Sequence, residues 1–129
     1  MISYRPIKWQ NWITGDTSIP KEWPAAKRYR ATVLRRRIAR AARDCKEVWH
    51  FNSFCRTYAE QVALYAASLN GTGNLAAKPG TSNHEKGKAA DVSVGGSPVG
   101  ASSKRRRACQ NYKLGFPVKG EAWHVEIVA

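Results

Sequence analysis

The chain of 129 residues has few acidic side chains, and this shortage is its strongest compositional bias. Nine aspartates and glutamates stand against 22 lysines and arginines, which gives a formal net charge of +13. A charge of this size favours a polyanionic partner, and nucleic acid, an anionic membrane surface and an acidic cell wall all satisfy that description. Charge alone does not choose among the three.

Long apolar runs are also missing. No stretch approaches the roughly 20 residues that a membrane-spanning helix needs, so we expect no transmembrane segment. The first residues, MISYRPIKWQNWITG, lack the basic start, apolar centre and small-residue cleavage site of a signal peptide. We therefore expect synthesis in a cytoplasm without signal-directed export, so that action outside it requires another route of release.

Cysteine is scarce, with three residues that have no metal-ligand spacing: Cys45, Cys55 and Cys109. The odd number leaves at least one thiol without a partner in the chain. We predict that all three are small buried residues.

Hydrophobic residues make up 43% of the chain, which is typical of a globular protein. The length is sufficient for one domain with one core.

Hydrophobic periodicity divides the chain into an N-terminal segment and one domain. Residues 1–25, rich in tryptophan and proline, are interpreted as an irregular segment packed on a domain of residues 26–129. Apolar spacings of three and four predict helices there, and alternation with aromatic or β-branched residues predicts strands. The predicted elements, in order, are a helix over 26–46, a strand over 47–54, a helix over 57–69, a strand over 89–94, a basic helix over 104–114 and a strand over 122–128. This order fits a compact single α+β domain and does not force a parallel sheet.

Two of the predicted helices have clear apolar stripes. The stripe of the helix over 26–46 consists of Ala31, Leu34, Ile38, Ala41 and Cys45. The arginines of this helix fall largely off that stripe, which suggests contact with a polyanion. They are Arg30, Arg35, Arg36, Arg37, Arg40 and Arg43. In the helix over 57–69, Thr57 and Glu60 predict a capping box, and the stripe consists of Tyr58, Val62, Tyr65 and Leu69.

The stretch SNHEKGKAAD, residues 82–91, invites comparison with the helical zinc motif H-E-x-x-H, but Lys88 stands where that motif needs histidine. His84 and Asp91 can instead combine with His124, because two imidazoles and one carboxylate are a common ligand set of catalytic zinc. Glu121, expected in a turn just before His124, is placed to act as a general base. On spacing alone, ordinary polar residues remain an alternative to a metal site.

Three motifs in order resemble the zinc D-alanyl-D-alanine carboxypeptidases, the VanY-like branch of the peptidase M15 group, which also includes phage endolysins that cut L-alanyl-D-glutamate bonds. SNHEKGKAAD matches S-x-H-x-x-G-x-A-x-D, EAWHVE matches E-x-W-H, and FCRTYAEQVALY is similar to the arginine-bearing segment that precedes them. The resemblance covers residues 30 to 127. It implies a Hedgehog/DD-peptidase-like fold with a small, mainly antiparallel sheet and flanking helices.

The resemblance also implies the metal ligands and the base. His84, Asp91 and His124 would bind zinc, the expected cofactor, and Glu121 would act as general base and later as general acid. Glu85 is expected at the surface.

Other roles follow from the resemblance with open alternatives. Arg56 would stabilise the oxyanion, with a structural ion pair as the alternative. Ser82 would bind substrate or hold a turn. Gln61 would contact substrate, support another site residue or lie on the helix surface. Trp123 is expected in the core, and Glu126 has no assigned role.

These expectations describe a monomeric zinc peptidase that acts on the peptide stems of bacterial peptidoglycan, in the manner of a phage endolysin made in the host cytoplasm. Its basic surface would hold it on the anionic cell envelope, with no specific nucleic acid as partner. The alternatives are a cellular D-alanyl-D-alanine carboxypeptidase, a protein that keeps the fold and zinc without catalysis, and a basic nucleic-acid-binding module.

Overall fold

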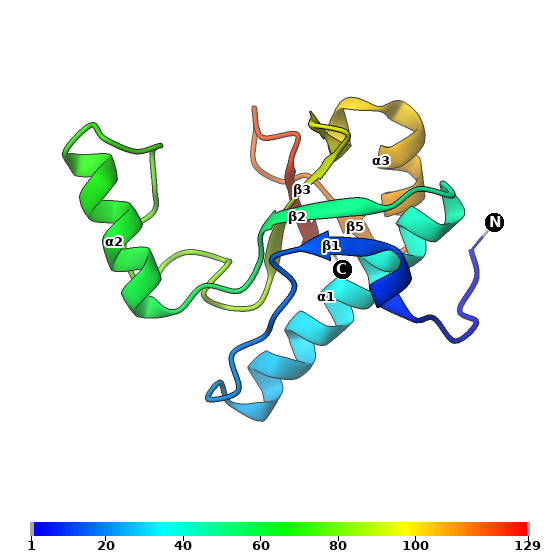
Figure 1. Cartoon of the computed structure of the whole chain (residues 1–129), viewed down its shortest axis with the longest axis horizontal. Coiled ribbons are helices and arrows are strands. Elements are labelled where there is room, and N and C mark those ends of the chain that lie inside the picture. The colour runs from blue at the N-terminus through cyan, green and yellow to red at the C-terminus, as the bar shows by residue number, and fades with distance from the viewer. Residues whose placement is uncertain (1, 129) are drawn as a thin grey trace.

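A mixed six-stranded sheet forms the centre of the computed structural model, which describes residues 2–128 (Figure 1). The strand order is β1-β2-β3-β6-β5, and β4 pairs with β3 outside this path. Four of the five pairings among the described strands are antiparallel, and the β1–β2 pairing is parallel. The strands are β1 (Ile13–Gly15), β2 (Trp49–Ser53), β3 (Ala89–Val94), β4 (Ser97–Pro98), β5 (Leu114–Gly115) and β6 (His124–Ile127). The α+β class with a mainly antiparallel sheet is therefore confirmed.

Helix α1 (Ala25–Asp44) supplies one side of the core. Its predicted stripe is buried, with Ala31, Leu34 and Ile38 all at 0% exposure. The stripe belongs to the same apolar cluster as Trp49 and Phe51 of β2. Full burial of a side chain the size of leucine or phenylalanine is worth about 1.5–3 kcal/mol, so this layer contributes much of the domain's stability.

Helix α3 (Ser103–Gln110) is shorter than the predicted basic helix over 104–114. The hydroxyl of Ser102 accepts a hydrogen bond from the backbone N–H of Arg105 and caps its start. Lys113 then adopts a left-handed φ of 58°, which turns the chain away from the helix and into β5. The connection before α3 contains the 3-10 turn η2 (Val99–Ala101).

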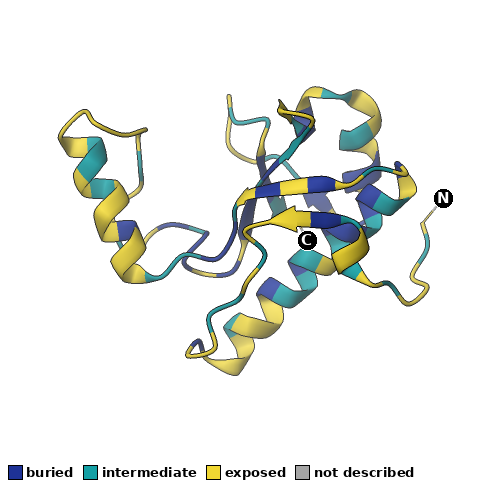
Figure 2. Cartoon of the chain, in the orientation of Figure 1, coloured by how far each residue is buried: buried dark blue, intermediate teal, exposed yellow. Residues whose placement is uncertain are grey.

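Helix α2 (Tyr58–Leu69) begins with the predicted capping box: Thr57 accepts from the N–H of Glu60, and the Glu60 carboxylate accepts from the N–H of Thr57. Its apolar stripe is largely exposed. Tyr58 is 64% exposed and Leu69 is 69% exposed, and the side chain that α2 buries is Gln61. Figures 1 and 2 show why: α2 stands apart from the sheet, and most of its surface is open to solvent.

The N-terminal segment packs on the domain but is not wholly irregular. Trp23 is buried, and Trp9 and Trp12 pack against the core from its edge. The sequence did not predict the 3-10 turn η1 (Trp9–Asn11) or strand β1, which pairs with β2 from Ile13 opposite Trp49. A strand of three residues is too short to give a periodic signal.

Most arginines of α1 make contacts within the protein rather than forming a free basic face. Arg35 donates to the Thr17 carbonyl at 2.7 Å, and its guanidinium lies 4.0 Å from the centre of the Trp9 ring. Similar bonds to backbone carbonyls are made by Arg30, Arg37 and Arg43. Arg36 is exposed. The arginines therefore fasten the surrounding segments to α1, which the pattern of charges did not predict.

The three cysteines are buried, as expected, and none of them forms a disulfide. Burial raises the pKa of the Cys55 and Cys109 thiols to about 12, so both remain protonated and unreactive at neutral pH. Over residues 2–128, no helix has the length and apolarity needed to cross a membrane.

Candidate active site

A tight loop between α2 and β3 carries His84 into the domain. Gly87, with a φ of +71°, lets the chain turn back toward β3, and a Cβ there would lie 3.0 Å from the Lys27 carbonyl oxygen. The Glu85 carboxylate accepts hydrogen bonds from the backbone N–H groups of Gly80 and Ser82. Glu85 is therefore a buried residue that holds the loop, and its expected place at the surface is wrong.

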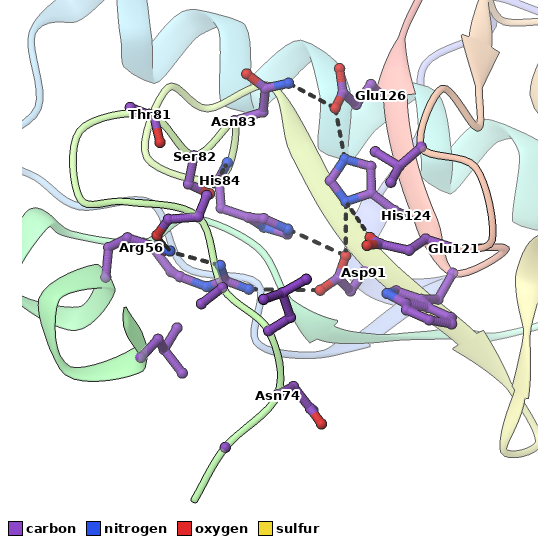
Figure 3. Close-up of a pocket in the computed structure, with 18 of the residues that line it drawn as sticks. Arg56, Asn74, Thr81, Ser82, Asn83, His84, Asp91, Glu121, His124 and Glu126 are labelled. Atoms are coloured by element: carbon purple, nitrogen blue, oxygen red, sulfur yellow. Dashed lines mark hydrogen bonds and ion pairs between the residues drawn. The ribbon is translucent and has the colours of Figure 1, made fainter. Parts of the chain in front are cut away.

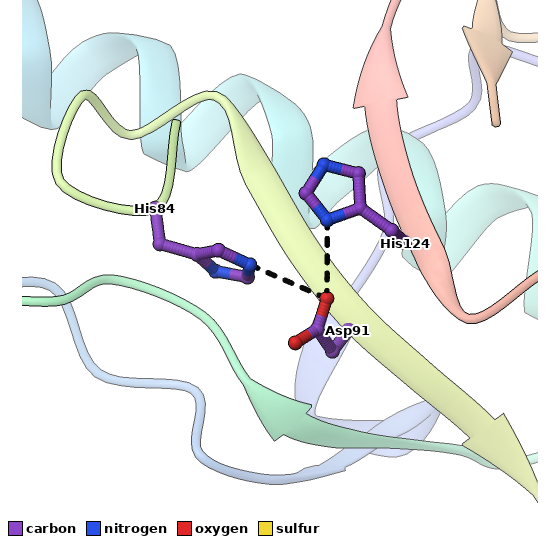
Figure 4. A group of neighbouring side chains, drawn as sticks. All are labelled: His84, Asp91 and His124. Atoms are coloured by element: carbon purple, nitrogen blue, oxygen red, sulfur yellow. Dashed lines mark ion pairs between the residues drawn. The ribbon is translucent and has the colours of Figure 1, made fainter. Parts of the chain in front are cut away.

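Three elements bring together the predicted metal ligands His84, Asp91 and His124. Asp91 of β3 lies directly opposite His124, the first residue of β6, and the loop places His84 beside both (Figure 4). The Asp91 Oδ1 atom is 3.3 Å from His84 Nε2 and 3.3 Å from His124 Nδ1. One ligand atom from each residue lies within 4.8 Å of the other two.

The arrangement fits a metal ion better than a hydrogen-bonded cluster. The Asp91 Oδ1 atom is buried and accepts no hydrogen bond, although two imidazole nitrogens face it. Nitrogen and oxygen ligands held about 2.0–2.1 Å from a tetrahedral zinc ion lie about 3.3 Å apart, which is the spacing of both pairs that include Asp91 Oδ1. A bound cation would satisfy the carboxylate oxygen and both ring nitrogens together.

Each imidazole is oriented through its other ring nitrogen. His84 Nδ1 donates to the Phe54 carbonyl at 2.8 Å, which leaves the Nε2 lone pair facing Asp91. His124 Nε2 lies 2.6 Å from Glu126 Oε2 and donates to it, which leaves Nδ1 facing Asp91. Glu126, for which the sequence predicts no role, lies two positions after His124 in the strand and therefore on the same face of the sheet.

The ionisation of the cluster follows from these contacts. Burial raises the pKa of the Asp91 carboxyl, but the imidazoles of His124 and His84 outweigh it and hold that pKa well below its usual range. Burial lowers the pKa of His124, and the carboxylates of Asp91 and Glu126 more than reverse this effect. Asp91 therefore stays anionic at neutral pH and can serve as a ligand.

Glu121 lies in the turn before β6, as predicted from Gly120, which has a φ of +82°. The backbone N–H of His124 donates to the Glu121 carbonyl and closes this turn. Glu121 Oε1 is 3.8 Å from His124 Nδ1, and the side chain is 41% exposed. The Glu121 carboxylate is thus beside the His124 nitrogen that faces Asp91, and it is open to a water molecule.

Arg56 reaches the cluster from the opposite side (Figure 3). Its guanidinium donates to Ser53 Oγ through Nε and Nη2 and to Gln61 Oε1 through Nη1, and Nη2 is 3.7 Å from Asp91 Oδ2. Gln61 is fully buried and donates its amide N–H to the Ala77 carbonyl. The alternative of an exposed helix residue is wrong, and the engaged amide favours support of Arg56 over substrate contact.

Ser82 is buried beside His84, and its hydroxyl accepts a hydrogen bond from the backbone N–H of that residue. This contact gives Ser82 the turn role considered from the sequence. Its hydroxyl proton is not used in that bond, so a contact with substrate remains a prediction.

These residues line a cavity of about 720 Å³ (Figure 3). Part of its wall is apolar, with Leu64 and Leu75 from α2 and its following loop, and Val118 and Trp123 from the segment before β6. Trp123 is 39% exposed, so its expected place in the core is wrong. The cavity therefore combines a few converging polar groups with an apolar wall, a composition typical of ligand-binding sites.

Comparisons with known proteins add a fold relationship. No protein-family profile and no curated protein matches the chain. Among solved structures, the chain is similar to the LdcB LD-carboxypeptidase, whose structure is described as revealing the molecular basis of peptidoglycan recognition. The TM-score is 0.59 at 21% identity, over 89% of this chain and 66% of that chain. The expected fold is therefore confirmed, and at this identity the similarity establishes the fold alone.

Proposed function

We propose that this protein is a zinc-dependent peptidase that hydrolyses the peptide stems of bacterial peptidoglycan. One observation carries the proposal: two oriented imidazole nitrogens face a single buried carboxylate oxygen that has no hydrogen-bond partner, at the floor of an open cavity. The ordered sequence motifs and the fold shared with a peptidoglycan-recognising carboxypeptidase support the same class of substrate.

The ligands and the base have distinct tasks. His84, Asp91 and His124 would hold zinc, which when bound polarises a substrate carbonyl and lowers the pKa of a water molecule to about 7. Glu121 takes the proton from the attacking water and returns it to the leaving amine, and its exposure leaves room for both transfers.

Arg56 supplies a fixed positive charge for the oxyanion that develops on the scissile carbonyl. Its bonds to Ser53 and Gln61 hold the guanidinium in place before substrate binds, so little reorganisation accompanies the reaction.

The cavity supports cleavage within a stem rather than removal of its last residue. A carboxypeptidase must bind the terminal carboxylate of its substrate, for which a second cation is the usual partner. Among the described residues that line the cavity, Arg56 is the one lysine or arginine, and its position suits the oxyanion. We therefore favour an endopeptidase, such as an endolysin, over a D-alanyl-D-alanine carboxypeptidase.

We also propose that a basic surface holds the enzyme on the anionic envelope, although fewer arginines are free for this contact than the net charge suggests. The net charge is +13, but several α1 arginines are engaged inside the protein. Exposed residues such as Arg28 and Arg36 would carry the attraction to the envelope. The same internal contacts weigh against a nucleic-acid-binding face on α1.

Glu121→Gln tests the proposal directly. The variant keeps the side-chain shape and lacks the base, so we expect a folded protein with about one zinc per chain and turnover lowered about 10²-fold or more. Zinc content is measured by atomic absorption, and cleavage by mass spectrometry of digested peptidoglycan. A wild-type protein that binds no zinc, or a variant with normal turnover, contradicts the assignment.

A further inference from the structure

Glu126 makes a buried contact that the catalytic scheme above does not use. It follows His124 by two residues on β6, so both side chains project from the same face of the strand. Its Oε2 atom lies 2.6 Å from His124 Nε2, and the Glu126 side chain is 14% exposed. The same oxygen accepts a hydrogen bond of 2.9 Å from Asn83 Nδ2.

We propose that Glu126 is the positioning residue of His124, an inference that rests on the proposed zinc site. By accepting the Nε2 proton, the carboxylate fixes the tautomer in which Nδ1 carries the free lone pair. It also fixes the rotation of the ring, so that this lone pair faces the point toward which His84 Nε2 and Asp91 Oδ1 converge. Carboxylate partners of this kind also make a ligating imidazole more basic.

The two histidine ligands are held by different kinds of acceptor. A neutral backbone carbonyl, that of Phe54, holds His84, whereas an ionised side chain holds His124. Glu126 also completes the charge of the site: three carboxylates and one guanidinium line the cavity, which leaves two negative charges. A divalent cation balances that sum, and without Glu126 the sum would be one negative charge.

Asn83 extends the contact to the other histidine. It immediately precedes His84 in the loop, and its bond to Glu126 ties this loop to β6 (Figure 3). Glu126 therefore joins the two segments that carry the imidazoles, while Asp91 lies between them on β3. Loss of the carboxylate should loosen the spacing of the ligands as well as the orientation of one ring.

Zinc affinity of the purified chain, measured by competition with a chromophoric chelator, tests the proposal without reference to activity. Glu126→Gln keeps the shape and removes the charge, and loss of such a partner weakens metal binding by about 10- to 100-fold. Glu22→Gln makes the same change of charge at an exposed site and should leave zinc affinity unchanged. Glu121→Gln should lose turnover but keep a zinc affinity within about threefold of that of the wild-type protein, because the Glu121 carboxylate is not a ligand.

Asn83→Ala provides a second variant if Glu126→Gln folds poorly. It leaves the carboxylate in place and removes only the link to the loop, so we expect zinc binding weaker by about three- to tenfold. Circular dichroism and the Tm of the zinc-free proteins establish that each variant is folded.

The outcomes separate the two proposals. If the wild-type protein and folded Glu126→Gln bind zinc with equal affinity, the role of Glu126 is overturned and the proposed zinc site stands. Equal affinities of wild type and Asn83→Ala overturn the link through the loop. Failure of the wild-type protein itself to bind zinc overturns the proposed function and this inference with it.

Discussion

Replacing Arg56 by lysine and Gln61 by leucine, singly and together, should separate direct action on the substrate from positioning. Arg56→Lys keeps a positive charge but loses the planar fork that bonds Ser53 and Gln61. Removing one oxyanion donor typically lowers kcat by about 10²–10³-fold, and the retained charge puts this variant near the lower figure. We expect KM to change little, because the interaction belongs to the transition state.

Gln61→Leu acts on the same guanidinium from helix α2, in the wall of the cavity. Arg56 keeps its two bonds to Ser53 and loses one, so kcat should fall about tenfold, which corresponds to about 1.4 kcal/mol. The variant also leaves the Ala77 carbonyl without its donor, which lowers the free energy of unfolding by about 1–3 kcal/mol. Gln110→Leu, at an exposed position of α3, is the matched control and should change neither quantity.

The double variant decides between the two roles of Gln61. If Gln61 acts only through Arg56, its replacement has no further effect once lysine stands at position 56, and kcat remains about 10²-fold reduced. If the two effects multiply to about 10³-fold, Gln61 contacts the substrate directly and the positioning role is refuted. The assay is steady-state cleavage of a soluble stem peptide with verified zinc content, alongside urea unfolding.

Three further predictions follow from other contacts. The Arg105 guanidinium beside Glu47 lowers the pKa of that carboxyl from 4.5 to about 2, so the stability that the ion pair provides is complete above pH 4.5 and is lost as the pH falls toward 2. Glu47→Gln should therefore remove the dependence of the free energy of unfolding on pH in this range, measured by urea unfolding, and an unchanged dependence would show that the pair does not contribute. Arg35→Glu should lower the free energy of unfolding by about 2–4 kcal/mol, because it removes a charged hydrogen bond and a cation–π contact. Arg36→Glu should change that free energy by no more than about 0.5 kcal/mol and should weaken wall binding at low salt, so equal losses of stability would contradict the contacts described for α1. Amidation of the C-terminus of a stem peptide should leave its cleavage rate within about threefold, whereas a loss of about 10²-fold or more would identify a carboxypeptidase that depends on a charged terminus.

The sequence predicts the parts of this fold that have local causes. The stripe of α1, the capping box of α2 and the turn at Glu121 each depend on residues within a few positions of one another, and all three are present. The alignment of Asp91 with His124 depends on the pairing of β3 with β6, which no local pattern determines. Ligand chemistry allowed these two residues to share a site, and the resemblance to known motifs favoured it over ordinary polar roles.

The errors also have physical causes. The apolar stripe of α2 is present but largely exposed, because periodicity reports that a helix is amphipathic and does not say whether another element covers it. Glu85 was expected at the surface because charge favours solvent, yet backbone N–H groups of its own loop satisfy the carboxylate. Alternation along a strand does place Glu126 on the same face as His124, two residues before it, but it does not indicate that the two side chains are in contact.

The exposure of α2 has a consequence for motion. Gln61 is the side chain that α2 buries, so the amide protons of this helix should exchange with solvent through a local opening that costs much less free energy than global unfolding. The amides of α1, whose stripe lies in the core, should exchange far more slowly. Since the same Gln61 side chain holds the Arg56 guanidinium, each opening of α2 also frees that group. Under the proposed function, the fraction of molecules with Arg56 in place for catalysis would depend on the local stability of one exposed helix, and a peptide bound against Leu64 should slow exchange throughout it.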